Sequence, residues 1–170
     1  MIKFFILRAF AIFITWQVLY NFILLPARIP DRFLTNITAF STSKLLSVFY
    51  YNVEHVYALT NSTRLALIKI NGAKIIGVAD PCNALDIYVL YVSFLFCFPG
   101  NWKRRLLFIA LGVPYIFALN TVRCVMIAWL NMNYRGWVEI SHHYIFTTAL
   151  YLLVFHVWAL YTKKGMNHAA

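Results

Sequence analysis

Long apolar runs, separated by short polar or basic stretches, dominate the pattern of this chain. The runs cover residues 4–25, 83–98, 106–130 and 140–161. A helix of about 20 apolar residues spans the hydrocarbon core of a bilayer, so we predict a membrane-spanning helix for each run. No A-x-A-like cleavage site follows the first run, which favours a retained span over a cleaved signal peptide. The pattern therefore predicts an all-α integral membrane protein built as a small helical bundle.

The stretch 33–53 fits this pattern less well. It is apolar but carries Thr35, Thr38, Ser41 and Lys44 at intervals. It is either a further span or a helix that lies in the membrane interface. The bundle therefore has four or five transmembrane helices, depending on this stretch.

A different pattern precedes residue 83. Two β-prone runs flank Asn71-Gly72, a pair that favours a tight hairpin because both residues tolerate a positive φ. Open sheet edges do not occur in hydrocarbon. We therefore predict a short β-hairpin outside the lipid, within an extracytoplasmic segment 54–82. This hairpin is expected to fix the start of the next helix and to offer an edge for an extended substrate motif.

Composition agrees with a membrane protein of one domain, residues 1–170. Hydrophobic residues make up 62% of the chain and charged residues only 12%, whereas soluble domains are about half apolar and a quarter charged. The net charge of +10 comes from clusters between the apolar runs, notably 103–105 and 163–164. Such clusters favour the cytoplasmic side. We therefore expect membrane lipid around the chain and no nucleic acid as a partner.

The segment Asp80-Pro81-Cys82 is the centre of the functional prediction. Asp80 suits a helix N-cap and Pro81 the first helical position, which places Cys82 in the first turn of the helix that follows. Unpaired backbone N–H groups and the helix dipole there favour the reactive thiolate. The three cysteines of the chain form no C-x-x-C pair and no Cys/His ligand spacing, so we expect no metal and no cofactor.

The orientation set by the basic clusters brings other reactive residues to the same membrane face. Arg123 lies late in an outward-running helix, and His142 and His143 begin the last helix, so all of them share the extracytoplasmic depth of Cys82. An arginine within an apolar span is a functional candidate because its burial is costly. In this arrangement a thiolate attacks an acyl carbon, a histidine transfers the proton, and the arginine stabilises negative charge. Supporting candidates are Asn83, Asn120 and Asp86.

Three short segments, each at a helix end, resemble the exosortase/archaeosortase family of membrane cysteine transpeptidases. They are Pro81-Cys82-Asn83-Ala84, Asn120-Thr121-Val122-Arg123 and His142-His143-Tyr144-Ile145-Phe146. The resemblance implies catalytic roles for Cys82, Arg123 and one histidine. His143 is favoured because the family's histidine precedes an aromatic stretch, and His142 stays open as the alternative. Thr147-Thr148 stands where the family often has Gly-Trp.

The resemblance also implies a function. The enzyme would cleave exported proteins that carry a C-terminal motif, a transmembrane helix and a basic tail. It would act at the outer face of the bacterial inner membrane, transfer the new carboxyl end to a surface acceptor, and be linked to exopolysaccharide production. The alternative is a non-catalytic membrane subunit of a polysaccharide export or assembly system. A small transporter is a weaker third reading, because few polar residues lie at mid-membrane depth.

Overall fold

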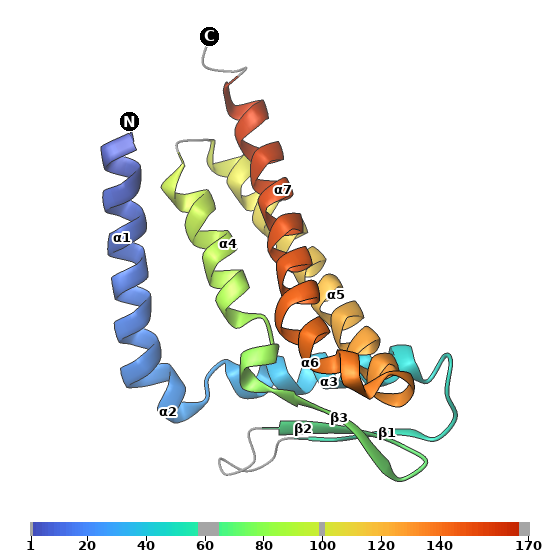
Figure 1. Ribbon diagram of the computed structural model, residues 1–170. Helices are drawn as coiled ribbons and strands as arrows, with labels where there is room; N and C mark the ends of the chain where they lie inside the picture. Colours follow the sequence, from blue (N-terminus) through green and yellow to red (C-terminus); the bar gives the residue numbers. More distant parts are fainter. Residues whose placement is uncertain (1, 58–64, 99–100, 167–170) are drawn as a thin grey trace.

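The computed structural model of the protein describes residues 2–57, 65–98 and 101–166. Long helices stand side by side as a bundle, and a small sheet lies with a shorter helix across one end of it (Figure 1). Residues 58–64, part of the predicted extracytoplasmic segment, lie outside the described residues.

Three helices form the compact part of the bundle: α4 (Leu85–Cys97), α5 (Trp102–Asn133) and α7 (Phe146–Met166). Between α5 and α7 the chain makes three short turns of helix: η3 (Arg135–Trp137), α6 (Val138–Ile140) and η4 (Ser141–Ile145). The bundle core contains large apolar side chains from all three long helices, namely Ile87, Tyr91, Leu95, Ile116, Leu150, Val154 and Tyr161. At 1.5 Å per residue α5 is about 48 Å long, which exceeds the hydrocarbon thickness of a bilayer.

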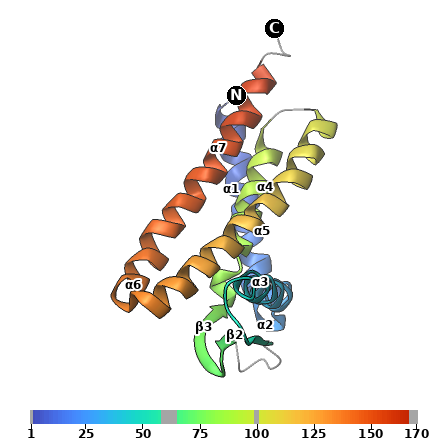
Figure 2. The ribbon, with the colours of Figure 1, turned by 90° about the vertical axis from the view of Figure 1, so that its right-hand side faces the viewer.

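Helix α1 (Ile2–Leu19), extended by η1 (Tyr20–Leu24) and α2 (Leu25–Ala27), stands beside the bundle (Figures 1 and 2). Near its start the Phe5 ring contacts the rings of Phe94 on α4 and of Phe98, the residue after α4, at centroid distances of 6.1 and 5.1 Å. None of its most apolar window is buried inside the protein. Its apolar surface is therefore available to lipid.

The sheet has three antiparallel strands in the order β1-β2-β3: β1 (Val53–Val56), β2 (Leu65–Ile70) and β3 (Ala73–Ala79). Asn71 and Gly72 connect β2 to β3 with φ values of 52° and 78°, as a two-residue hairpin turn requires. The predicted hairpin is therefore present. The first strand was not predicted: it begins at Val53, where the ambiguous stretch 33–53 ends, and continues into the predicted segment 54–82.

Helix α3 (Asp31–Leu46) lies across the bundle axis, between the sheet and α5 (Figures 1 and 2). After the buried Asp31 at its start, its buried face consists of small and hydroxyl side chains with one leucine: Thr35, Thr38, Ala39, Thr42, Ser43 and Leu46. Small side chains let a helix approach its neighbours closely, which explains the polar residues in this stretch. With 16 residues the helix is about 24 Å long, shorter than the hydrocarbon core. Its length and direction favour the interfacial reading of 33–53.

Two segments of the described chain are long and apolar enough to cross a membrane, Phe5–Ala27 and Trp102–Asn133. Leu85–Cys97 is a shorter apolar helix. The described structure is therefore mostly helical, with two helices able to cross a membrane and a small sheet. The count of four or five spans stays a prediction.

Candidate active site

Cys82 lies in a short connection between the sheet and the bundle. It ends η2 (Asp80–Cys82), a single 3-10 turn that begins directly after β3. Ala84 then takes a left-handed conformation with a φ of 66°, and α4 starts only at Leu85. The prediction that Cys82 occupies the first turn of the long helix is therefore wrong, and the thiol is not among the first N–H groups of α4.

The carboxylate of Asp80 pairs with Arg28 instead of capping a helix. Arg28 donates from Nε to Asp80 Oδ2 at 3.0 Å and from its terminal nitrogen to Oδ1 at 2.8 Å. The Thr35 hydroxyl donates to the same Oδ1 at 2.9 Å. Arg28 and Asp80 are buried, with exposed fractions of 3% and 7%. The N-cap prediction for Asp80 fails because a charged partner 52 residues away competes for the carboxylate.

Asn83 fixes the other side of Cys82. Its Oδ1 accepts a hydrogen bond from the backbone N–H of Leu85 at 2.8 Å, and its Nδ2 donates to Asp31 Oδ1 at 2.8 Å. Asp31 also accepts a hydrogen bond from the hydroxyl of Tyr20 at 3.1 Å. Asn83 thus supplies the capping contact at the start of α4 and joins this start to α3.

Asn120 on α5 holds the backbone of Cys82 itself. Its Nδ2 donates to the carbonyl oxygen of Cys82 at 3.0 Å, and the residue is completely buried. The segment 80–83 is therefore tied to α3 on one side and to α5 on the other. These contacts fix the position of the thiol without touching its sulfur.

His142 contacts the thiol. Its Nε2 lies 3.4 Å from Cys82 Sγ, within the range of a hydrogen bond to sulfur. The residue belongs to the π-helical turn η4, and its carbonyl oxygen accepts a hydrogen bond from the Thr147 hydroxyl at 2.9 Å. A π-helical turn changes the direction of side chains relative to a regular helix and is common at functional sites.

A cavity of about 220 Å³ brings Cys82, His142 and Arg123 together. Its remaining lining comes from β3, α5 and α6: Ile76, Gly77, Val78, Cys124, Ile127, Asn131 and Val138. Arg123 is half-buried, and its Nε has no hydrogen-bond partner among the described residues. The cavity thus combines a thiol, an imidazole and a guanidinium with largely apolar walls, a set that suits nucleophilic attack on an acyl carbon.

A family model described as transmembrane exosortase (Exosortase_EpsH) matches residues 3–160. The chain belongs to the transmembrane exosortase family. No curated protein and no solved structure matches it. As a family, exosortases are membrane proteins of sorting-signal processing and are generally cysteine peptidases or transpeptidases.

The exosortase match extends the resemblance beyond the motifs that first indicated it. Those motifs cover about residues 70–160, whereas the family match also includes α1 and α3. Arg28, Asp31 and Thr35, which hold the Cys82 segment, lie in this added part. Sequence reasoning missed them. The one available signal in the sequence was the presence of two oppositely charged residues, Arg28 and Asp31, on either side of Pro30 in a mostly apolar chain.

The structure gathers most of the predicted exosortase site residues. Cys82, Arg123 and His142 line one cavity, with Asn83 and Asn120 behind the cysteine. The side chain of His143, the histidine favoured from sequence, lies outside the described residues.

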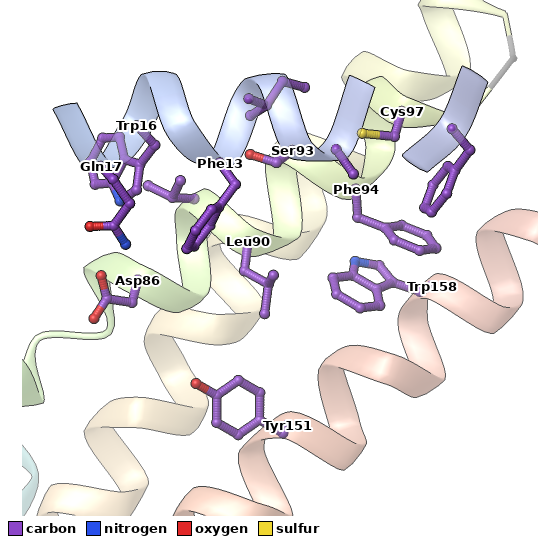
Figure 3. A pocket seen from close by; sticks show the side chains of 14 residues that line it. Phe13, Trp16, Gln17, Asp86, Leu90, Ser93, Phe94, Cys97, Tyr151 and Trp158 are labelled. Carbon is purple, nitrogen blue, oxygen red and sulfur yellow. The ribbon is translucent and has the colours of Figure 1, made fainter. Parts of the chain in front are cut away.

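Asp86 does not join this cluster. Figure 3 shows Asp86 beside Gln17 and Trp16, in a second cavity of about 510 Å³ between α1, α4 and α7. That cavity is mostly aromatic and aliphatic, and Cys97 lines its other end. Asp86 lies in the first turn of α4, whereas Cys82 precedes the left-handed Ala84 and lies outside that helix.

No group of three or more metal-binding side chains lies together in the part of the chain that the structure describes.

Proposed function

We propose that this exosortase is a cysteine peptidase or transpeptidase in which Cys82 is the nucleophile, His142 the general acid and base, and Arg123 the electrostatic stabiliser. The observation that carries the proposal is the 3.4 Å contact between Cys82 Sγ and His142 Nε2 at the wall of a cavity that Arg123 also lines. A nucleophile and a base within hydrogen-bond reach are the minimum for covalent catalysis.

In the first half of the reaction His142 takes the thiol proton, and Cys82 Sγ attacks the carbonyl carbon of the substrate. The carbonyl oxygen becomes an oxyanion, which the Arg123 guanidinium stabilises. Arg123 lines the same cavity as Cys82, which supports this role. Collapse of the intermediate breaks the C–N bond, and His142 returns its proton to the leaving amine. The product is a thioester on Cys82.

In the second half an acceptor nucleophile attacks the thioester carbon. His142 removes the proton of the nucleophile and then protonates the leaving Cys82 sulfur. Water as nucleophile gives hydrolysis, and an amine or hydroxyl of a surface molecule gives transfer. Arg123 stabilises the second oxyanion as it does the first.

The placement of charges supports a site on the extracytoplasmic face. The start of α1, the end of α7 and the start of α5 lie at one end of the bundle, and the sheet, α3 and α6 lie at the other (Figure 1). The first of these ends carries Lys103, Arg104, Arg105 and Lys163 without acidic residues, whereas the basic residues at the other end are interspersed with all five acidic residues of the chain. Positive residues prefer the cytoplasmic side, so Cys82 faces outward from the inner membrane.

This orientation suits substrates that carry a C-terminal motif, a transmembrane helix and a basic tail. The tail would lie at the cytoplasmic side and the motif at the depth of Cys82. We include the transfer of the cleaved protein to a surface acceptor, and the link to exopolysaccharide, in this proposal.

The test is the fate of the exported precursor in cells that produce Cys82→Ala or Cys82→Ser in place of the native protein. Cys97→Ala is the matched control, since Cys97 lines the other cavity. We expect the uncleaved precursor to accumulate with both Cys82 variants, while the control processes it normally and all variants remain in the membrane. Normal processing with Cys82→Ala contradicts the proposal and favours a non-catalytic membrane subunit.

A further inference from the structure

Strand β3 forms an edge of the sheet directly beside the candidate active site. In the strand order β1-β2-β3 it pairs with β2 alone among the described residues. Its residues Ile76, Gly77 and Val78 line the same cavity as Cys82. The strand then leads without a loop into the turn that carries the thiol. The edge and the nucleophile are thus parts of one continuous segment.

The register shows which backbone groups of β3 point away from the sheet. The backbone N–H of Asn71 donates to the carbonyl oxygen of Asn52 at 3.1 Å, so Asn71 directs its groups toward β1. Directions alternate along a strand, and Leu67, four residues earlier, also faces β1. Gly77 is the partner of Leu67 on β3. In such a pair both residues direct their N–H and C=O outward, so the groups of Gly77 point away from β2.

A side chain already uses the neighbouring outward group. The Nδ2 of Asn131 on α5 donates to the carbonyl oxygen of Ile75, two residues before Gly77 on the same strand. For Gly77 itself the described residues offer no such partner. An unpaired N–H and C=O at a sheet edge form a template for another extended chain.

We propose that the outer edge of β3 binds the main chain of the substrate's sorting motif as an added strand, with the N–H and C=O of Gly77 as its hydrogen-bonding groups. This inference rests on the proposed function and specifies how that function binds its substrate. Main-chain hydrogen bonds bind an extended peptide whatever its sequence, and the walls of the cavity then select among the side chains of the motif. The added strand directs the scissile carbonyl along β3 toward Cys82.

Gly77 allows a matched pair of variants. Gly77→Pro removes the outward N–H, and proline is tolerated where the N–H of an edge strand faces away from its neighbour. Gly77→Ala keeps the N–H. Its added Cβ would lie 3.3 Å from Leu65 Cδ2, the end of a flexible side chain, so the strand can accommodate it. The two variants therefore differ mainly in the hydrogen bond under test.

The experiment measures alkylation of Cys82 in the purified full-length protein by mass spectrometry. The probe is a pool of acetylated tetrapeptides of mixed sequence with a C-terminal chloromethyl ketone, and iodoacetamide serves as a reagent that needs no strand. We expect Gly77→Pro to lower the rate with the peptide pool about five- to tenfold, the value of one hydrogen bond. Gly77→Ala should change the rate with the peptide pool less than twofold, and both variants should change the rate with iodoacetamide less than twofold. Equal peptide rates for Gly77→Pro and Gly77→Ala would overturn the inference.

A second measurement uses only the native protein, so it holds even where the proline variant does not fold. N-methylation of the peptide pool at one of two adjacent residues should slow alkylation, and methylation at the other should not, because alternate residues face the edge. Equal rates for both pools contradict strand addition. A different result refutes the proposed function: iodoacetamide would then alkylate Cys82 at the same rate in His142→Ala as in the native protein.

Discussion

The buried ion pair between Arg28 and Asp80 provides a quantitative test of how the Cys82 segment is held. Arg28→Met removes the guanidinium and keeps much of the side-chain volume. Two hydrogen bonds to a charged group, at 2.8 and 3.0 Å, are lost. The Asp80 carboxylate, with 8% of its side chain exposed, then keeps only the Thr35 hydroxyl as a side-chain donor among the interactions described above.

The expected cost follows from these contacts. Hydrogen bonds to charged groups contribute about 1.5–3 kcal/mol each. Breaking a buried ion pair by removing one partner costs about 3–5 kcal/mol, largely because the remaining charge stays buried. We therefore expect Arg28→Met to lower the free energy of unfolding by about 3–5 kcal/mol. A loss of this size is a large fraction of the stability of a small protein.

The assay is unfolding in mixed micelles on titration with sodium dodecyl sulfate, followed by tryptophan fluorescence. The double variant Arg28→Met/Asp80→Asn is the control, because a neutral amide removes the uncompensated charge and still accepts a hydrogen bond from Thr35. It should recover at least half of the loss. A loss below about 1 kcal/mol for Arg28→Met, the range of exposed ion pairs, would refute the reasoning.

Two further contacts give smaller tests. Gly112→Ala should lower the free energy of unfolding by about 1–3 kcal/mol through overpacking, since the new Cβ would lie 2.1 Å from the Tyr91 hydroxyl oxygen. Thermal unfolding in detergent measures this loss, and Gly112→Ala should cost less in a Tyr91→Leu background, where the clash is removed. Asn120→Ala should slow alkylation of Cys82 by iodoacetamide, because it removes the donor to the Cys82 carbonyl, while the amount of protein in the membrane changes little. Asn120→Asp also lacks that donor and should slow the reaction in the same way. An unaltered rate in both variants would show that this contact does not position the thiol.

Features set by local chemistry were predictable from the sequence. The apolar runs predicted the helices, and Asn71-Gly72 predicted the hairpin, because its turn needs two residues with positive φ. Cys82 and Arg123 line one cavity. The basic clusters in the loops predicted this, because they orient the helices and so indicate which helix ends lie at the same membrane face.

Features that depend on distant partners were not predictable. Asp80 has the properties of an N-cap, yet Arg28 takes its carboxylate. The helix after Cys82 starts late because Ala84 is left-handed, and no local residue preference indicates this. The hydroxyl-rich face of α3 is buried because it packs against the sheet and α5, and these contacts are tertiary.

The choice between His142 and His143 shows the same limit. Adjacent residues on a helix point in directions about 100° apart, so only one of them can face the thiol. A π-helical turn at Ser141–Ile145 shifts these directions, and no residue pattern in the sequence predicted that turn. The aromatic stretch after His143 favoured that residue, whereas the geometry supports His142.

The rate at which iodoacetamide alkylates Cys82 at neutral pH, compared between the native protein, His142→Ala and His143→Ala, tests the central claim most directly. The 3.4 Å contact predicts that His142→Ala slows the reaction at least tenfold, while His143→Ala stays within about twofold of the native rate. The opposite result, loss in His143→Ala and a native rate in His142→Ala, would contradict the account.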